Sequence, residues 1–130
     1  MQLVDDPAFR GAITSAPWML DFALFGHWDL GTVQRFGAAI RDVVLRLPSL
    51  GIGPGEQVAL FDITGFAVQS PDVLAALGEI ADRSRITSRR IALVRSSTLL
   101  SMQAKRALPH LPMFDSRDAA LAWLREEGPA

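Results

Sequence analysis

The stretch of the chain that most limits its fold is QVALFDI, residues 57 to 63. Its apolar residues follow one another almost without interruption and end in a single acid. A strand with one wet face alternates apolar and polar residues instead, so this run predicts a central strand covered on both faces. The short run RIALV, residues 90 to 94, predicts a second buried strand.

The segment between these two strands has the pattern of a helix. Ser70 is a suitable N-cap and Pro71 a suitable first helical residue. Apolar residues then recur at helical spacing: Val73, Leu74, Leu77, Ile80 and Ala81. The stretch FDITGFAVQSPDV, residues 61 to 73, therefore breaks as a strand at Gly65 and restarts as a helix.

The rest of the chain shows further strand and helix patterns. A hairpin around a Ser-Ala-Pro turn would place Trp18, Leu20, Phe22 and Leu24 on one face, and a helix would bury the stripe Val33, Phe36, Ile40, Val43, Val44 and Leu47. The additional elements expected are strands at 8–14 and 18–26, a helix from Asp29 to Leu47, a helix at 98–108 capped by Ser96 or Ser97, a short strand at 113–114, and a helix opened by Asp115 and Asp118 that runs through Leu124.

This order predicts an α/β sandwich with a mixed sheet, in which a leading hairpin is followed by parallel strands. About four helices pack on the sheet, and right-handed crossovers join the parallel strands. A chain of 130 residues suits one core, so residues 1–130 are expected to form a single domain. Ligands on such sheets favour the carboxyl ends of the strands. Those ends are GHWD (26–29), DITG (62–65) and RSS (95–97).

Composition excludes several classes of protein. The chain has no cysteine, which rules out disulfides, thiolate metal sites and cysteine nucleophiles. Its first ten residues carry two acids where a signal peptide needs basic residues, and no apolar run approaches the roughly 20 residues that cross a bilayer. We therefore expect a cytoplasmic protein with no membrane span.

Charge is unevenly distributed along the chain. Residues 83–106 hold seven Arg or Lys and no acid, although the net charge of the whole chain is only -1. The block is a candidate surface for an anion or an acidic partner, formed by Arg83, Arg85, Arg89, Arg90 and Arg95. The alternative is that these residues end helices and solvate the surface. No nucleic-acid binding is expected, because no aromatic residue is interleaved with the arginines.

Catalytic and cofactor motifs are weak. A Ser-His-Asp site could be assembled from Ser70 or Ser97 with His27 and Asp62, but the chain has no Gly-x-Ser-x-Gly elbow. Two isolated histidines give no metal-binding spacing. The glycines of GIGPG, residues 51–55, precede a strand instead of following one, so they do not form a phosphate loop. We expect no metal and no cofactor.

Three stretches resemble a known family. DITGF after the third expected strand resembles the STAS domains of anti-sigma-factor antagonists and sulphate-transporter tails. RRIALVRSSTLLSMQAKRAL and MFDSRDAALAWL resemble more closely the SpoIIAA-like bacterial proteins, mostly uncharacterised, whose last helix ends in Ala-x-x-Trp-Leu, here Ala120, Trp123 and Leu124. The resemblance covers about residues 8–126 and implies a SpoIIAA/STAS-like fold.

The same resemblance bears on regulation. Antagonist-type STAS domains carry an Asp-Ser-Ser-Gly motif in this loop, and a partner kinase phosphorylates its first serine. Aligned from Asp62 without gaps, this chain has Ser70, Pro71, Asp72 and Val73 in those places, so proline stands at the phosphorylated position. A shift of one residue would be needed to bring Ser70 there. The resemblance therefore implies the fold without the phospho-serine switch.

We expect a non-enzymatic binding or regulatory module that contacts a protein partner. The candidate binding residues are His27, Asp62, Gly65, Ser70 and Asp72. An alternative is a carrier of a small apolar or lipid-like ligand, because SpoIIAA-like proteins also resemble the CRAL-TRIO fold. A small hydrolase is the third alternative, and a homodimer is compatible with the sequence.

Overall fold

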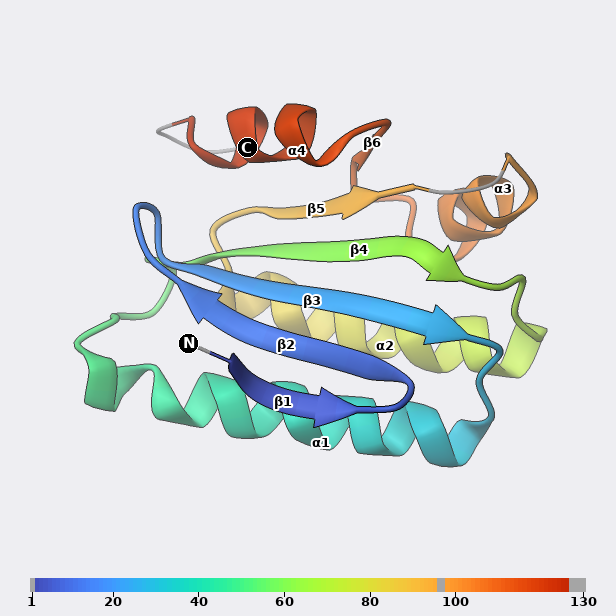
Figure 1. Cartoon of the computed structure of the whole chain (residues 1–130), viewed down its shortest axis with the longest axis horizontal. Helices are drawn as coiled ribbons and strands as arrows, with labels where there is room; N and C mark the ends of the chain where they lie inside the picture. Colours follow the sequence, from blue (N-terminus) through green and yellow to red (C-terminus); the bar gives the residue numbers. More distant parts are fainter. Residues whose placement is uncertain (1, 96–97, 127–130) are drawn as a thin grey trace.

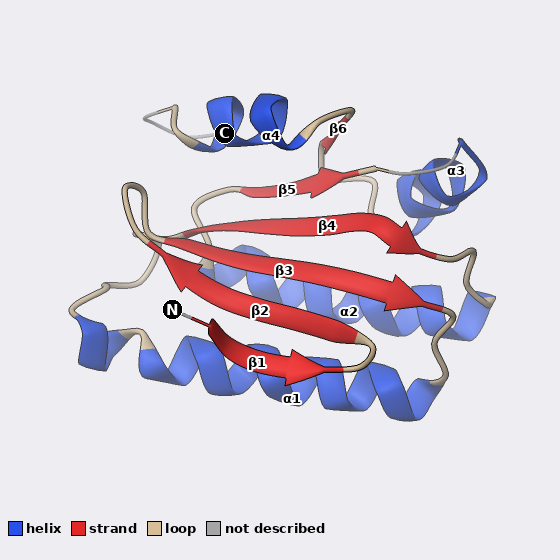
Figure 2. Ribbon diagram, viewed as in Figure 1, coloured by secondary structure: helices blue, strands red, loops and turns tan. Residues whose placement is uncertain are grey.

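A computed structural model describes residues 2–95 and 98–126, with the side chains of 2–3 and 85–87 outside that description. Within this part, one mixed sheet and four α-helices form the fold (Figures 1 and 2). The elements are β1 (Gln2–Asp6), β2 (Phe9–Thr14), β3 (Met19–Gly26), α1 (Leu30–Arg46), the 3-10 helix η1 (Pro48–Leu50), β4 (Val58–Phe66), α2 (Pro71–Thr87), β5 (Ile91–Val94), α3 (Thr98–Ala107), β6 (Met113–Phe114) and α4 (Arg117–Leu124).

The spatial order of the strands follows their order in the chain, from β1 to β6. β1, β2 and β3 are antiparallel neighbours, whereas β3 to β6 are parallel. The predicted mixed sheet, with a leading hairpin and later parallel strands, is confirmed. Each crossover leads to the adjacent strand, and right-handed connections of this kind place α1, α2 and α3 on one face. The helix α4, after β6, packs on the other face.

Aromatic rings form the centre of the core under α1. The ring of Phe36, part of the predicted helical stripe, lies 5.3 Å from Phe9, 5.8 Å from Phe22, 5.2 Å from Trp28 and 6.1 Å from Phe61, measured between centroids. Tilted and edge contacts at such distances are favourable for aromatic pairs. The cluster therefore fixes α1 to β2, β3 and β4.

The strand β4 is covered on both faces, as its apolar run predicts. Phe61 points into the core beneath α1, α2 and α3. Leu60 belongs to the smaller cluster on the opposite face, where it packs with Ala120 and Leu124 of α4. Both strand residues are buried because helices lie on the two sides of the sheet.

The edge strand β1 was not predicted. Its two acids, Asp5 and Asp6, interrupt the apolar pattern from which strands were predicted. Asp6 also shapes the turn into β2, because its carboxylate accepts the N–H of Ala8 at 2.9 Å and the Nε–H of Arg35 in α1 at 3.2 Å. Short length and charged side chains are usual on an exposed sheet edge.

The expected break of the strand at Gly65 is wrong, because β4 continues to Phe66. Ala23 lies opposite Asp62 and Phe25 lies opposite Gly65, so β4 uses one more residue than β3 over this interval. Such a β-bulge bends a strand without ending it. The glycine marks a change of register instead of a strand end.

The start of β3 also differs from the prediction. Leu20, Phe22 and Leu24 are buried on the core face as expected, but Trp18 lies in the turn before β3 and is 38% exposed. Alternation of apolar residues gives the facing of side chains within a strand but not the residue at which the strand begins.

Candidate functional site

The parallel strands β3, β4 and β5 end at the same edge of the sheet, on the right in Figure 1. The connection from β3 to α1 comprises residues 27–29, the connection from β4 to α2 comprises residues 67–70, and α3 follows β5. We call the surface formed by residues 27–30, 67–72 and the exposed side of α3 the strand-end face.

A buried glutamine holds the two connections together. Gln69 is 3% exposed. Its Oε1 accepts the N–H of Trp28 at 2.8 Å, and its Nε2 donates to the carbonyls of Gly26 at 2.9 Å and Ala67 at 2.7 Å. A buried polar side chain satisfied in this way rigidifies its surroundings.

A second glutamine ties the same loop to α3. Gln103 accepts the N–H of Gln69 through Oε1 at 3.0 Å and donates from Nε2 to the Gln69 carbonyl at 2.9 Å. Neither glutamine was predicted as a site residue. The sequence carries no signal for them, because glutamine is usually exposed and these two lie far apart in the chain.

His27 lies at the strand-end face and is exposed. Its Nδ1 is 3.0 Å from the carbonyl oxygen of Val68, so the nitrogen that donates there is Nδ1. Asp29, two residues on, accepts the N–H of Thr32 at 2.8 Å and its hydroxyl at 2.9 Å. These hydrogen bonds, the backbone one first, hold the pKa of Asp29 below its ordinary value.

Asp62 is not part of the strand-end face. Its carboxylate accepts the N–H of Thr64 at 2.9 Å and the hydroxyl of the same residue at 2.6 Å. Along β4 it shares the face of Leu60, which is the face that α4 covers. Arg117 of α4 pairs with Asp21. The hydrogen bond to Asp21 and, to a smaller extent, the negative charge of Asp62 raise the pKa of Arg117. The aspartate therefore completes a charged group beside α4.

Gly65 has a structural reason to be glycine. A Cβ built there would lie 2.8 Å from Cδ1 of Phe25, closer than real Cβ contacts. The ring of Phe25 lies against this glycine on one side, and the guanidinium of Arg10 lies 4.9 Å from the ring centroid. Gly65 makes room for an aromatic ring on the face of the sheet away from α1, α2 and α3.

Ser70 and Asp72 open α2. The Ser70 hydroxyl oxygen accepts the N–H of Val73 at 3.4 Å, Pro71 occupies the first helical turn, and Asp72 is exposed in that turn. Each residue type suits a helix N-terminus. The predicted helix start is confirmed.

Among the described residues, the structure does not bring the candidate Ser, His and Asp side chains together. His27 bonds a backbone carbonyl, Asp62 bonds Thr64 on another surface, and Ser70 caps a helix. Ser97, the other candidate nucleophile, lies outside the described residues. Within residues 2–95 and 98–126, no three His, Cys, Asp or Glu side chains cluster as metal ligands would. No helix of that part combines the length and apolar character that crossing a membrane takes.

In the described part of the chain, the sheet does not show the topology that forms the ligand crevice of many α/β enzymes. Ligand crevices form where successive crossovers leave a parallel sheet on opposite faces. Here α1, α2 and α3 all contribute to the same core cluster, on one face of the sheet. No such reversal occurs between the parallel strands β3 to β6.

Two arginines of the basic block fasten α4. Arg89 donates to the carbonyls of Leu124 at 2.9 Å and Glu126 at 2.7 Å. Arg90 donates to the carbonyl of Trp123 at 2.9 Å, and its guanidinium lies 4.7 Å from the Trp123 ring centroid. The side chain of Arg90 is only 5% exposed. Cations at the end of a helix suit its carbonyls and dipole.

The other arginines lie elsewhere. Arg83 lines a groove between α1 and α2 together with Arg41. Arg95 pairs with Asp115 and stands at the opposite end of β5 from Arg90, about 16 Å away along an extended chain. The side chain of Arg85 is outside the description. The described arginines therefore do not form one patch, and Arg90 is a buried structural residue.

Apolar side chains are exposed around the strand-end face. Leu30 begins α1, Val68 precedes α2, and Leu99 and Met102 lie on the first turns of α3. Their exposed fractions are 48%, 39%, 58% and 54% respectively. The hydrogen bonds of His27 to Val68 and of Gln103 to the neighbouring loop show that these segments adjoin. A contiguous exposed apolar patch is typical of an interaction surface, and the adjoining of these segments makes the four residues a candidate for one.

Sheet order, helix placement and strand-end loops together define an α/β domain with the SpoIIAA/STAS-like fold. Several solved structures share this fold, among them the following two. One is an uncharacterised protein from the DUF3478 family with a SpoIIAA-like fold, from Shewanella loihica, at TM-score 0.61 and 19% identity over 94% of this chain and 98% of that one. The other is an anti-sigma factor antagonist from Mycobacterium paratuberculosis, at TM-score 0.61 and 15% identity over 95% of this chain and 100% of that one.

The sequence itself matches no protein-family model and no curated protein. The likeness is therefore one of three-dimensional structure over nearly the whole chain. At 19% and 15% identity it establishes the fold. The predicted SpoIIAA/STAS-like sandwich is confirmed.

Proposed function

We propose that the chain is a non-enzymatic regulatory module of the STAS type, which binds a protein partner in the cytoplasm through its strand-end face. The anti-sigma factor antagonist among the structural neighbours supports a protein partner. Absence of the phospho-serine switch is part of the proposal. Its support is the helix-capping role of Ser70 and the proline that follows it.

The observation that carries the proposal is the combination of exposed apolar side chains with a fixed backbone. Val68 is exposed, yet the residues on either side of it are held, since Gln69 bonds both connections and α3. A surface already fixed in its binding shape loses less conformational entropy when a partner docks. The loop at residues 67–70 is therefore held in one shape before any partner binds, which suits it to recognising a protein partner.

Affinity capture with two interface variants tests this function. Val68→Glu places a charge in the apolar surface, and Asp72→Lys reverses a charge beside it. Leu45→Glu is the matched control, because Leu45 is 70% exposed near the far end of α1. We expect a protein captured by the wild type and by Leu45→Glu, identified by mass spectrometry, to be lost with the other two variants. Equal capture by all four proteins contradicts the proposal.

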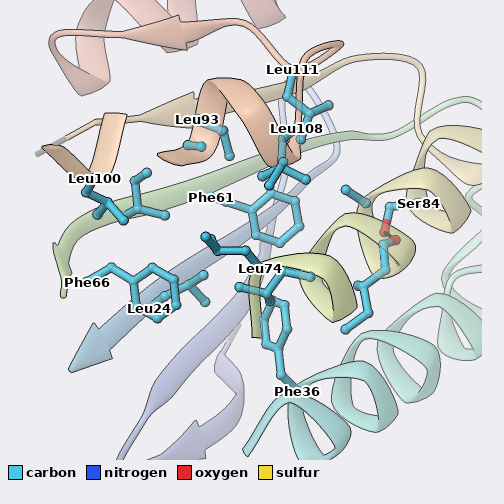
Figure 3. A pocket seen from close by; sticks show the side chains of 16 residues that line it. Leu24, Phe36, Phe61, Phe66, Leu74, Ser84, Leu93, Leu100, Leu108 and Leu111 are labelled. Carbon is cyan, nitrogen blue, oxygen red and sulfur yellow. Dashed lines mark hydrogen bonds between the residues drawn. The ribbon is translucent and has the colours of Figure 1, made fainter. Parts of the chain in front are cut away.

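A second candidate is carriage of a small apolar ligand. An apolar cavity of about 60 Å³ lies between the sheet and helices α2 and α3 (Figure 3). Sixteen residues line it, and Ser84 is the polar side chain among them. Ligand pockets usually measure about 300–1,000 Å³. The cavity fits a few carbon atoms as it stands, so a larger ligand requires α2 and α3 to move apart.

Native mass spectrometry of gently purified protein tests the carrier. We expect a retained apolar molecule with the wild type and none with Ala81→Phe, whose ring would fill the cavity from α2. Ala75→Phe, at an exposed position of the same helix, is the control. Spectra without an added mass for the wild type contradict this function. They also give the oligomeric state, for which a homodimer stays a prediction.

A further inference from the structure

A polar cleft lies beside α3, on the side where β5 and β6 end. It consists of two adjoining hollows of about 350 and 440 Å³. Arg95, Lys105 and Asp115 line both hollows, which is why we treat them as one cleft. The first hollow adds Thr98, Ser101 and Met102, and the second adds Leu108, Pro109, His110, Leu111, Pro112 and Met113.

The cleft has the volume of a small-molecule site, with charged groups in one part and apolar walls in another. Volumes of this order lie within the range of ligand pockets, about 300–1,000 Å³. The charged groups lie where the hollows meet, whereas Leu108, Leu111 and Met113 supply apolar walls to the larger one. The cleft therefore suits a molecule with one anionic end and one apolar end.

The charges in the cleft are not balanced. Arg95 makes an ion pair with Asp115, whose side chains are 42% and 80% exposed. A pair this exposed contributes little to stability, so Arg95 can change partner at small cost. Lys105 makes no ion pair with any residue in the described part of the chain. The cleft thus holds two cations and one carboxylate, and that carboxylate pairs with Arg95 alone and can be displaced.

The excess of positive charge in the cleft determines which ligand charge it should prefer. A monoanion that displaced Asp115 would only replace one carboxylate by another. A dianion neutralises both Arg95 and Lys105 and so gains an interaction that Asp115 does not provide. A phosphate monoester carries a charge of about -1.5 to -2 at neutral pH, and a guanidinium binds it through two parallel hydrogen bonds.

We propose that the cleft binds a small phosphate monoester. The phosphate lies between Arg95 and Lys105, and the organic part lies against Leu108, Leu111 and Met113. Asp115 holds Arg95 in the empty site and leaves it when the ligand enters. Neither Val68 nor Asp72 lines the cleft, although Met102 belongs both to it and to the strand-end face, and phosphate binding does not depend on the proposed partner binding.

Titration with matched small probes tests the site. Phenyl phosphate and benzoate share the ring but differ in charge, and inorganic phosphate lacks the ring. We expect phenyl phosphate at pH 7.5 to give saturable shifts of backbone amide NMR signals around Arg95, Lys105 and Asp115. Inorganic phosphate should bind more weakly at the same place, and benzoate more weakly still. Equal binding of benzoate overturns the dianion argument, and shifts confined to other regions overturn the site.

Three exposed substitutions separate a built site from general charge attraction. Lys105→Gln should raise the dissociation constant for phenyl phosphate about tenfold, since it removes a charge-assisted contact. Asp115→Asn should lower it, because the internal competitor is gone. Arg106→Gln removes the neighbouring cation, which does not line the cleft, and should change it less than about twofold. Amide spectra confirm the fold of each variant.

The proposal is overturned if Arg106→Gln weakens binding as much as Lys105→Gln does, or if Asp115→Asn weakens it. Loss of binding with Val68→Glu as well would show that the cleft and the partner surface are one site. Retained phosphate binding in a chain that captures no protein would refute only the proposed partner binding.

Discussion

Gln103 holds the backbone of Gln69 from both sides, with one hydrogen bond to its N–H and one to its carbonyl, at 3.0 and 2.9 Å. The first residue belongs to α3 and the second to the loop before α2. These two hydrogen bonds therefore tie the loop before α2 to α3.

Gln69→Ala should destabilise the fold by about 1–3 kcal/mol, because it leaves the buried N–H of Trp28 without its acceptor and removes a donor from the carbonyls of Gly26 and Ala67. Urea unfolding measures the loss. Gln34→Ala removes an exposed glutamine from α1 and should change stability by less than about 0.5 kcal/mol. Equal effects of the two substitutions would show that the buried network contributes nothing.

Gly65→Ala should destabilise the fold by about 1–3 kcal/mol, because the new Cβ would overlap the ring of Phe25. Thermal unfolding provides the measurement. Gly31→Ala is the control, since a Cβ there meets its nearest atom at an ordinary 3.4 Å within α1, and alanine favours a helix over glycine. The double variant Gly65→Ala, Phe25→Leu should recover part of the loss. Full stability of Gly65→Ala alone contradicts this role.

Arg90→Ala should release α4 before the rest of the fold. The substitution removes the hydrogen bond to the Trp123 carbonyl and the stacking on its ring, at a cost of about 2–4 kcal/mol. Amide hydrogen exchange should quicken across Arg117–Leu124 and stay slow in α1. Arg125→Ala, at an exposed position after α4, serves as the control. Uniform acceleration in both helices would refute local release.

Periodicity predicted most of the fold because it reports burial. QVALFDI identified the doubly covered strand, and the stripe containing Phe36 identified the helix that packs on it. The edge strand β1 was not predicted, because its two acids suit a solvent-exposed position and break the apolar pattern that marks a core strand. The spacing of apolar residues identifies the elements that face the core but gives no information on exposed elements such as β1.

The candidate site was predicted less well, for a related reason. The connection after β3 was placed correctly, whereas the expected strand end at DITG lies within β4. The glutamine pair that organises the connections depends on contacts between residues far apart in the chain. Arg90 belongs to a basic block that suggests a surface, yet it is buried against Trp123. A charge pattern gives no information on which cations find a partner inside the fold.

Acid should weaken the cap of α1 through Asp29. The N–H and hydroxyl of Thr32 donate to its carboxylate, which favours the charged form and holds the pKa of Asp29 below its ordinary value of 3.8. Because the folded pKa is the lower one, the stabilisation is fully present above about pH 4 and is lost as the pH falls through the folded pKa.

Carboxyl NMR titration gives the pKa of Asp29, and urea unfolding between about pH 2 and 6 gives the stability of the fold. Asn can still accept the N–H bond but does not titrate, so Asp29→Asn should be less sensitive to acid than the wild type. A pKa of 3.8 or above for Asp29, or the same acid sensitivity in both proteins, would show that the charged cap adds nothing to α1.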